Sequence, residues 1–264
     1  MKRVSPTVAL LASLLITLPA CARGKDKVET VKFTFKGKER SYLLQIPTAP
    51  DPSRPLPAVM LLHSQGGWDT DVMGSWHNFA SHEGFIVVAP ESVSNTMWDS
   101  RVDGPDYLHA VLLDVAKKHP IDPTRVYLYG DDSGGNYGIE VGLFDSQDWA
   151  ATCARASVID TSNYVLFQHA VYKEPFEVWV GDNDADHPLR VLALEHDAFT
   201  KAGFPFELKI IPNSSGANQT AYDEINDGCY KFFTQHPMPA PGAAYLAAAP
   251  AAAPAAATAP PAAK

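Results

Sequence analysis

The sequence is poor in cysteine and lacks the common metal-binding patterns. Only three cysteines occur in 264 residues, at positions 21, 153 and 229. No CxxC or HExxH spacing is present, so no zinc site or other metal site is predicted. No other motif indicates a bound group, and we expect no cofactor.

Positive charge and long apolar runs are also scarce. The chain has 21 Lys and Arg against 30 Asp and Glu, a formal net charge of −9 at pH 7, and no basic stripe or arginine cluster. This balance argues against a nucleic-acid partner. The apolar segment 8–18 is shorter than the roughly 20 residues of a transmembrane helix. It follows a basic start and precedes small residues, which predicts a signal peptide over residues 1–22.

The end of that segment leaves two routes of export open. Leu18-Pro19-Ala20-Cys21 resembles a bacterial lipobox, in which Cys21 would be lipidated and become the new N-terminus. The small residues on either side of Cys21 also fit ordinary cleavage. We therefore expect an exported protein. It would be either a periplasmic lipoprotein attached to the membrane through Cys21 or a secreted protein.

The other end of the chain is almost free of large and charged residues. Residues 237–264 are rich in alanine and proline, and the prolines prevent a continuous helix. This composition predicts a disordered tail and leaves residues 23–236 as one domain. Cys153 and Cys229 lie inside that domain. An exported protein often pairs such cysteines, but two buried free thiols fit the sequence equally well.

Short continuous apolar runs, typical of strands, alternate along the chain with the apolar spacing of helices, and this predicts the order of secondary structure. A hairpin is expected from strands 31–35 and 41–46, after which strands alternate with helices. This order predicts an α/β fold with a mostly parallel sheet and helices on both faces, and no insertion is long enough for a large lid. The expected strands are 58–62, 85–89, 126–129, 151–159, 176–180 and 206–211, and the expected helices are 71–83, 107–118, 135–144, 189–202 and 221–235.

Several segments together resemble a known superfamily. They are "LPAVMLLHSQGGW", "HPIDPTRVYLYG", "VWVGDND" and "GFPFELKIIP". Over about residues 30–236 the chain is similar to the α/β-hydrolases, and most similar to the secreted esterases related to feruloyl esterase and polyhydroxybutyrate depolymerase. The resemblance implies the α/β-hydrolase fold. It also implies carboxylic ester hydrolysis by a serine, an acid and a histidine in that chain order, with the serine in a G-x-S-x-G turn.

The nucleophile position departs from this pattern. Gly130-Asp131-Asp132-Ser133-Gly134 places Asp132 where the family has serine. A register one residue later places Ser133 there but loses the first glycine. The letters "DSGG" also resemble the nucleophile motif of chymotrypsin-like proteases, but those are antiparallel barrels and the strand–helix alternation argues against them.

The acid position is retained and the histidine position is not. Asp184 matches the family's acid, although it could instead cap the next helix. In the loop after the last strand, Ser214 stands where histidine is expected, and no histidine occurs between residues 197 and 235. His187, three residues after Asp184, could replace the missing base or could be an exposed loop histidine. Without a base, a serine hydroxyl remains a poor nucleophile.

The loop after the strand 58–62 is altered as well. His63-Ser64-Gln65-Gly66-Gly67 resembles the family's His-Gly-x-Gly-Gly oxyanion loop, with Ser64 in place of the first glycine. A backbone N–H of Ser64 or Gln65 could still bind an oxyanion, and His63 is expected to support the loop. Two loop tryptophans, Trp68 and Trp98, are candidate pocket residues, together with Gly66 and Ser214.

Three functions remain open on this pattern. The first is a catalytically degenerate α/β-hydrolase, in which the carboxylate of Asp132 occupies the oxyanion hole at a helix N-terminus. The second is an active ester hydrolase with a rearranged site that uses Ser133 or Asp132, with His187 as base. The third is a periplasmic protein that binds a small molecule, an ester or a related ligand, or acts as a scaffold. We favour the first.

One comparison within the superfamily bears on Asp132. Haloalkane dehalogenases and epoxide hydrolases use an aspartate in G-x-D-x-G, which attacks an alkyl carbon, and a histidine then activates water. The halide-binding relatives carry tryptophan directly after the aspartate, where this chain has Ser133. Because the expected histidine is missing, the resemblance of Asp132 to these enzymes does not by itself predict turnover.

Overall fold

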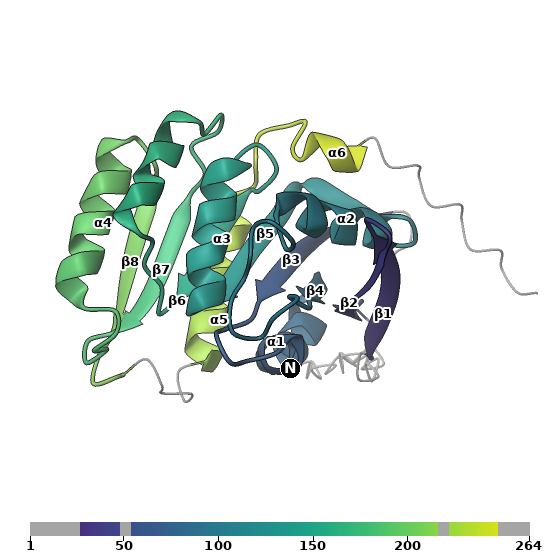
Figure 1. Cartoon of the computed structure of the whole chain (residues 1–264), viewed down its shortest axis with the longest axis horizontal. Coiled ribbons are helices and arrows are strands. Elements are labelled where there is room, and N and C mark those ends of the chain that lie inside the picture. The colour runs from purple at the N-terminus through teal and green to yellow at the C-terminus, as the bar shows by residue number, and fades with distance from the viewer. Residues whose placement is uncertain (1–26, 48–53, 216–221, 248–264) are drawn as a thin grey trace, which may run out of the picture.

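The computed structural model describes residues 27–47, 54–215 and 222–247 (Figure 1). The predicted signal peptide with Cys21 and the last part of the predicted tail, 248–264, lie outside these residues. Within the described ranges, no helix is long and apolar enough to cross a membrane.

One eight-stranded sheet organises the chain, in the order β1-β2-β4-β3-β5-β6-β7-β8. The predicted hairpin is confirmed, because β1 pairs with β2 and β2 pairs with β4 antiparallel. All other neighbours are parallel. The strands are β1 (Val28–Phe35), β2 (Lys38–Gln45), β3 (Leu56–Leu62), β4 (Ile86–Pro90), β5 (Ile121–Asp131), β6 (Ala151–Arg155), β7 (Phe176–Gly181) and β8 (Phe206–Ile211).

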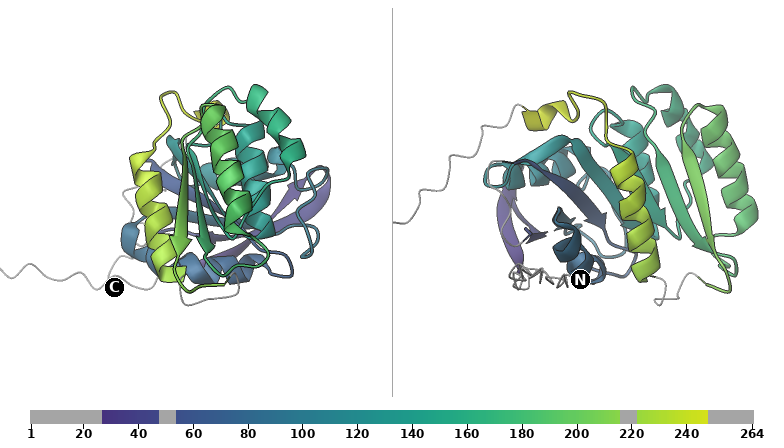
Figure 2. Two further views of the ribbon diagram at one scale, coloured as in Figure 1. Left: turned by 90° about the vertical axis from the view of Figure 1, so that its left-hand side faces the viewer. Right: turned by 180° about the vertical axis from the view of Figure 1, so that it is seen from behind.

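Helices cover both faces of the sheet, as predicted (Figures 1 and 2). One face carries α1 (Asp69–Glu83) and α5 (Tyr222–Gln235), and the other carries α2 (Pro105–Ala116), α3 (Ser133–Phe144) and α4 (Leu189–Lys201). The sequence did not indicate a 3-10 helix after β6, η1 (Thr161–Gln168). The strand expected over 151–159 is also shorter and ends at Arg155.

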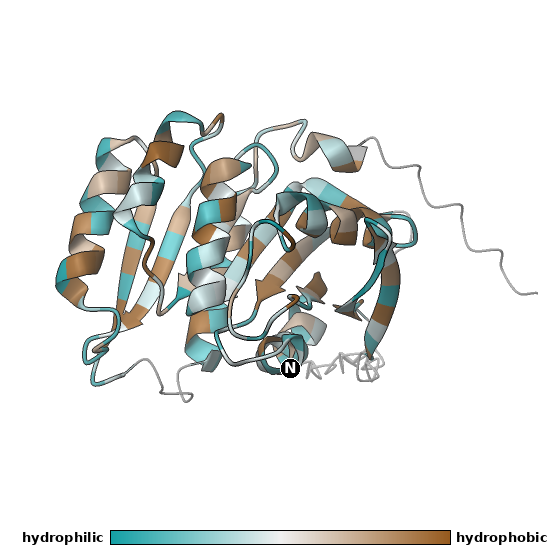
Figure 3. Ribbon diagram, viewed as in Figure 1, coloured by the Kyte–Doolittle hydropathy of each residue, from teal (hydrophilic) through white to brown (hydrophobic). Residues whose placement is uncertain are grey.

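The central strands are apolar on both sides because both sides are covered. Residues 58–62 of β3 are fully buried. Met60 packs toward α2, and its neighbour Val59 packs toward α1 and α5. Figure 3 shows hydrophobic residues along the central strands and on the inward faces of the helices. A parallel sheet between two helical layers therefore explains the continuous apolar runs.

The prediction that disorder begins at residue 237 is wrong for residues 237–247. The backbone N–H of Met238 donates to the carbonyl of Thr124 at 2.8 Å, and that of Ala243 donates to Pro123 at 2.8 Å. A short helix, α6 (Ala244–Ala247), follows and packs against α2. Ala243 is fully buried. Small apolar side chains and backbone hydrogen bonds thus anchor this segment despite its composition.

The two cysteines of the domain form a disulfide. Cys153 on β6 and Cys229 on α5 are bonded, with their Cα atoms 5.6 Å apart. The bond ties the sheet to the helix that packs on it. It closes a loop with a sequence separation of 76 residues, which corresponds to a stabilisation of about 4 kcal/mol through the lower entropy of the unfolded chain.

Candidate active site

Three loops at the carboxyl edge of the sheet bring the candidate residues together. Ser64 and Gln65 follow β3, Asp132 follows β5, and Asp184 and His187 follow β7. Because these strands are parallel, their carboxyl ends meet at one edge, where open α/β sheets place their sites. These five residues line one cavity of about 510 Å³.

Asp132 occupies the sharp turn between β5 and α3. Its φ of 52° and ψ of −117° are outside the regions that most side chains adopt. A Cβ on Gly130 would lie 2.3 Å from the carbonyl oxygen of Gly134, and a Cβ on Gly134 would lie 2.3 Å from that of Leu62. The turn therefore needs glycine two residues before and two residues after Asp132. This spacing is the G-x-D-x-G register.

Ser133 occupies a different environment from Asp132. Its hydroxyl oxygen is buried and has no hydrogen-bond partner among the described residues, and Ser133 does not line the cavity. The side chain of Asp132, in contrast, is 40% exposed. Asp132 is thus the residue of the turn that a ligand in the cavity can reach.

Asp184 holds both the backbone and the ring of His187. Its Oδ1 accepts hydrogen bonds from the N–H groups of Asp186 and His187, each at 3.0 Å. Its Oδ2 lies 3.2 Å from Nδ1 of His187. The side chain of Asp184 is only 2% exposed. With Nδ1–H directed at this carboxylate, Nε2 is the ring nitrogen that can accept a proton.

The remaining ring nitrogen of His187 faces the nucleophile position. Nε2 lies 3.8 Å from Oδ1 of Asp132, which is longer than a direct hydrogen bond. The other oxygen of Asp132, Oδ2, accepts a long hydrogen bond of 3.4 Å from the backbone N–H of Gln65. In space, His187 thus lies between the carboxylates of Asp132 and Asp184. This is the arrangement of nucleophile, base and acid in a hydrolase triad.

The histidine of the site comes from the loop after β7, and not from the loop after β8 where the resemblance predicts it. Ser214 is buried, and its carbonyl accepts the N–H of Asn183 at 2.9 Å. A Cβ on Gly181 would lie 2.2 Å from that same carbonyl. The expectation that Ser214 lines the pocket is wrong: it packs against the turn after β7, and its neighbour Ser215 lines the cavity.

The loop after β3 is held by His63 and Trp98. Nε2 of His63 lies 2.8 Å from the hydroxyl of Ser92, and the indole N–H of Trp98 donates to the carbonyl of His63 at 3.0 Å. Trp98 is 8% exposed and stacks on Tyr137. It supports the loop and does not line the cavity, so its assignment as a pocket residue is wrong.

The second tryptophan and the glycines of this loop also have defined places. Trp68 is 44% exposed, precedes α1 and lines neither of the two cavities at this edge of the sheet. Gly66 has a φ of 74°, and its N–H donates to the carbonyl of Asn95 at 2.6 Å. The loop after β3 is therefore also tied to the segment after β4.

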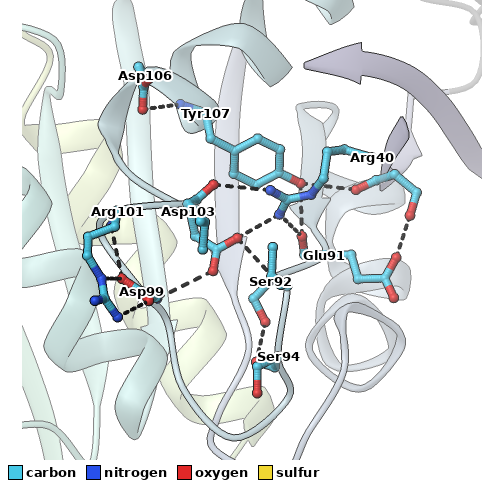
Figure 4. Close-up of polar contacts among 12 residues, drawn as sticks. Arg40, Glu91, Ser92, Ser94, Asp99, Arg101, Asp103, Asp106 and Tyr107 are labelled. Carbon is cyan, nitrogen blue, oxygen red and sulfur yellow. Dashed lines mark hydrogen bonds and ion pairs between the residues drawn. The ribbon is translucent and has the colours of Figure 1, made fainter. Parts of the chain in front are cut away.

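A buried ion pair that the sequence did not reveal anchors the segment after β4 (Figure 4). Nη2 of Arg40 lies 2.6 Å from Oδ1 of Asp103 and donates to the carbonyl of Glu91 at 2.7 Å. The side chains of Arg40 and Asp103 are 10% and 0% exposed. Oδ1 of Asp103 also accepts the N–H of Val93, and the guanidinium lies over the ring of Tyr107. The segment that holds His63 is thereby fixed to β2 and α2.

A second buried pair lies in the wall of the cavity. Nη1 of Arg155 contacts both carboxylate oxygens of Asp131, at 3.0 and 2.9 Å. The hydroxyl of Tyr222 donates to Asp131 at 2.8 Å, and the Arg155 guanidinium lies 4.2 Å from the ring of Tyr222. Burial raises the pKa of Asp131, and the charge of Arg155 opposes that rise. Burial also raises the pKa of Tyr222 to about 12, so its phenol is protonated at neutral pH.

A second cavity adjoins the first along α1. It has a volume of about 550 Å³ and shares four lining residues with the cavity at His187, namely Ser64, Gln65, Asp131 and Tyr222. Its other walls come from Gly66 and Gly67 of the loop after β3, from α1 and from the first turn of α5. The two hollows therefore form one polar site on either side of the oxyanion loop.

Comparison with known proteins supports the fold. No protein-family model matches the sequence, and no curated protein does so. An S-formylglutathione hydrolase from Agrobacterium tumefaciens has a TM-score of 0.64 at 15% identity, over 82% of this chain and 98% of the other. A ferulic acid esterase has a TM-score of 0.63 at 16% identity, over 80% and 98%. A dienelactone hydrolase from Anabaena variabilis has 0.60 at 16%, over 81% and 100%.

The same fold occurs within a longer protein. A candidate dipeptidyl aminopeptidase IV from Bacteroides ovatus has a TM-score of 0.64 at 17% identity, over 80% of this chain, and the chain covers 36% of that protein. At these identities the likeness concerns the fold. Together with the strand order, it confirms the α/β-hydrolase fold, and the structural neighbours named as esterases and ester hydrolases are carboxylic ester hydrolases of that fold.

Proposed function

We propose that this chain, which has the α/β-hydrolase fold, hydrolyses a substrate at an sp3 carbon through an alkyl ester on Asp132. One observation carries the proposal: the turn presents a carboxylate whose Oδ1 faces Nε2 of His187 and whose Oδ2 accepts the N–H of Gln65. Asp184 holds the histidine from behind. The missing base of the esterase pattern is thus replaced by a histidine from the loop after β7.

A carboxylate at this position is poorly suited to ester hydrolysis. Attack of Asp132 on an ester carbonyl would produce an anhydride by expelling an alkoxide. A carboxylate is a far better leaving group than an alkoxide, so the tetrahedral adduct returns to the reactants. Attack on an sp3 carbon avoids this problem because the product is an ordinary ester. The proposal therefore predicts little carboxylic ester hydrolysis, as a degenerate esterase would also show.

The first step uses the oxygen that faces His187. Oδ1 of Asp132 attacks the carbon, a carbon–oxygen bond forms, and the bond to the leaving atom breaks with its electron pair on that atom. The Gln65 N–H holds Oδ2 and so directs Oδ1 toward the cavity. Holding the reacting atoms in the correct orientation accounts for a large part of the rate enhancement of an enzyme.

The second step uses His187. Its Nε2 takes a proton from water, whose oxygen adds to Cγ of Asp132, and the N–H of Gln65 stabilises the oxyanion on Oδ2. The bond from Cγ to the alkyl oxygen then breaks, and the alcohol leaves with the proton from His187. The carboxyl group of Asp132 still carries the second proton of the water, and transfer of that proton to Nε2 of His187 and on to solvent restores the carboxylate. Asp184 stabilises the imidazolium that forms in between.

Epoxides fit the site better than alkyl halides. The tryptophan that binds halide in the aspartate-dependent relatives is replaced by Ser133, whose hydroxyl is buried outside the cavity. An epoxide needs instead a proton for its ring oxygen. The phenol of Tyr222 lines the cavity and is protonated at neutral pH. Its O–H donates to Asp131 at 2.8 Å, so it must turn away from Asp131 to donate to the opening ring, and the phenolate that results takes up, in place of solvent, the proton that the carboxyl group of Asp132 later gives up.

The test compares two probe substrates with the purified chain. We expect styrene oxide to be converted to the diol, p-nitrophenyl acetate to be left largely unhydrolysed, and Asp132→Asn to reduce epoxide turnover by at least about 10³-fold. Ser133→Ala is the matched neighbour and should retain activity. Efficient hydrolysis of p-nitrophenyl acetate that is lost in Ser133→Ala would instead identify an ester hydrolase with a rearranged site.

A second candidate is a binding protein without catalysis. It is favoured by the Gln65 N–H, which is already engaged by the carboxylate of Asp132, because a catalytically degenerate esterase with a blocked oxyanion hole would show the same contact. In that case neither probe would be turned over, and no covalent adduct would form on Asp132.

We also propose that the chain is exported. The basic and apolar start of the sequence supports this proposal, as does the disulfide between Cys153 and Cys229, because such bonds persist mainly in oxidising compartments. An intact mass of the mature chain from a bacterial host that still includes residues 1–20 would contradict it, and a diacylglycerol mass on Cys21 would identify the lipoprotein route.

A further inference from the structure

We propose that His109, Asp145 and Asp148 form a binding site for one zinc ion. The ligand atoms are Nε2 of His109 and one carboxylate oxygen from each aspartate, and these three atoms all lie within 4.8 Å of one another. The site lies at the opposite edge of the sheet from Asp132. The inference therefore does not depend on the proposed function.

Segments that are distant in the sequence build this site. His109 lies on α2, Asp145 caps the C-terminus of α3, and Asp148 stands three residues before β6. Because α3 leads from the carboxyl end of β5 to the amino end of β6, both aspartates lie at the edge where the parallel strands begin. Figure 1 shows α6 at the same edge, and its Tyr245 stacks on His109 with ring centroids 4.3 Å apart. Since His109 and Asp145 are 36 positions apart, no local spacing in the sequence indicates the site.

The distances between the ligand atoms fit tetrahedral coordination. Nε2 of His109 lies 3.4 Å from Oδ2 of Asp148 and 3.8 Å from Oδ2 of Asp145. Zinc binds imidazole nitrogen and carboxylate oxygen at about 2.0–2.2 Å, and tetrahedral angles then place neighbouring ligand atoms about 3.3–3.6 Å apart. The imidazole ligand favours zinc over magnesium and calcium, which prefer oxygen alone. A small rotation of the Asp145 side chain completes the arrangement.

His109 has a buried nitrogen that no other group satisfies. Its Nε2 is buried and has no hydrogen-bond partner among the described residues, although two carboxylates lie beside it. A histidine that served only as an ion-pair partner would direct its N–H at a carboxylate oxygen about 2.7–2.9 Å away. Buried polar atoms are ordinarily paired. The nitrogen is therefore placed to bind an ion between itself and the two carboxylates.

Two further unpartnered polar groups lie next to His109. The hydroxyl of Tyr245 and the indole N–H of Trp149 are both buried without a partner among the described residues. Trp149 is fully buried, and its ring centroid lies 6.1 Å from that of His109. A zinc ion with three protein ligands keeps a water or an anion in its fourth position. We assign the Tyr245 hydroxyl as the hydrogen-bond partner of that fourth ligand.

The charge of the site also fits a divalent cation. The side chains of Asp145 and Asp148 are only 17% and 12% exposed. Burial raises the pKa of both carboxyls, and the charge of His109 opposes that rise. The amide of Gln147 donates to the two carboxylates at 3.5 and 3.3 Å but brings no charge. A protonated His109 would balance one of the two negative charges, whereas a zinc ion on the neutral imidazole balances both.

Zinc titration of the untagged full chain tests the site. After removal of metal with EDTA, calorimetry should detect one tight zinc site. His109→Gln should weaken it by at least about 100-fold, since loss of an outer hydrogen-bond partner alone costs about 10–100-fold. His196→Gln is the matched control and should keep the wild-type affinity, because His196 lies on α4, beside Asp197 and 41% exposed. Equal zinc affinity in wild type and His109→Gln would overturn the inference.

The candidate active site needs its own control, because His187 also lies between two carboxylates. His187→Gln should leave the tight zinc site unchanged. Loss of that site in His187→Gln and not in His109→Gln would overturn the inference. A crystal of the wild-type chain soaked in zinc gives a readout that does not depend on folding of the variants. The anomalous difference peak is expected beside Nε2 of His109, and a peak found only elsewhere would contradict the proposal.

Tyr245→Phe tests the fourth position. Phenylalanine keeps an aromatic ring on His109 and removes only the hydroxyl, so zinc affinity should fall by about tenfold. Tyr230→Phe is the control, because Tyr230 stacks on Phe85, a residue of the core on the other face of the sheet, and it should leave zinc affinity unchanged. Unchanged affinity in Tyr245→Phe would overturn the role assigned to that hydroxyl.

Discussion

Replacement of His187 by glutamine is expected to stop the reaction after its first step and to leave the substrate attached to Asp132. Glutamine cannot take a proton from water, so the alkyl ester forms but is not hydrolysed. We expect turnover to fall by about 10²–10⁴-fold. Intact mass spectrometry should show an increase equal to the mass of the epoxide, and peptide mapping should place it on Asp132.

The control for this experiment is a histidine outside the site. His196 lies on α4 with a side chain that is 41% exposed, and His196→Gln should retain activity and form no adduct. If His187→Gln kept normal turnover, His187 would not be the base. If it lost turnover with no adduct on Asp132, the covalent route would be wrong.

Removal of the guanidinium of Arg155 is expected to cost the most stability. Arg155→Leu would leave Asp131, whose side chain is 12% exposed, without its cation. Breaking a buried pair by removing one partner typically lowers the free energy of unfolding by about 3–5 kcal/mol. Urea denaturation of the full chain at pH 7 would measure the loss. Asp131→Asn combined with Arg155→Leu should recover much of it, since no uncompensated charge then remains.

The same variant should become relatively more stable in acid. Without Arg155, burial raises the pKa of the Asp131 carboxyl further above its unfolded value. A carboxyl with a raised folded-state pKa contributes stability at low pH that is lost as pH rises through that pKa. The difference in unfolding free energy between wild type and Arg155→Leu should thus shrink from pH 7 toward pH 4. A difference independent of pH would show that lost packing, and not charge, causes the effect.

Local patterns in the sequence were sufficient to predict most of the fold. Apolar runs such as residues 58–62 are typical of strands covered on both faces, and their alternation with amphipathic helices indicates a mostly parallel sheet. Composition was a poorer guide at the C-terminus. Residues 237–247 look disordered because they contain little to bury, yet backbone hydrogen bonds to Pro123 and Thr124 hold them, and such bonds leave no trace in composition.

The candidate site was predictable where backbone geometry restricts the residue type. The glycines at 130 and 134 favour Asp132 as the residue of the turn, because a Cβ at either position would meet backbone of the facing segment. Trp98 shows the opposite case. Its place in a loop suggested a pocket, but its indole N–H reaches the carbonyl of His63, a contact between segments 35 residues apart.

The residue pattern alone was enough for the fold class, for Asp132 at the turn and for the loss of histidine at Ser214, since each of these depends on local periodicity or spacing. The partner of Asp132 required the folded chain. Whether His187 is a loop histidine or a base depends on the turn that Asp184 stabilises and on the parallel strands that bring β5 and β7 to the same edge. The contact of His187 with Asp132 joins residues more than 50 positions apart in the sequence, and only packing of the sheet decides it.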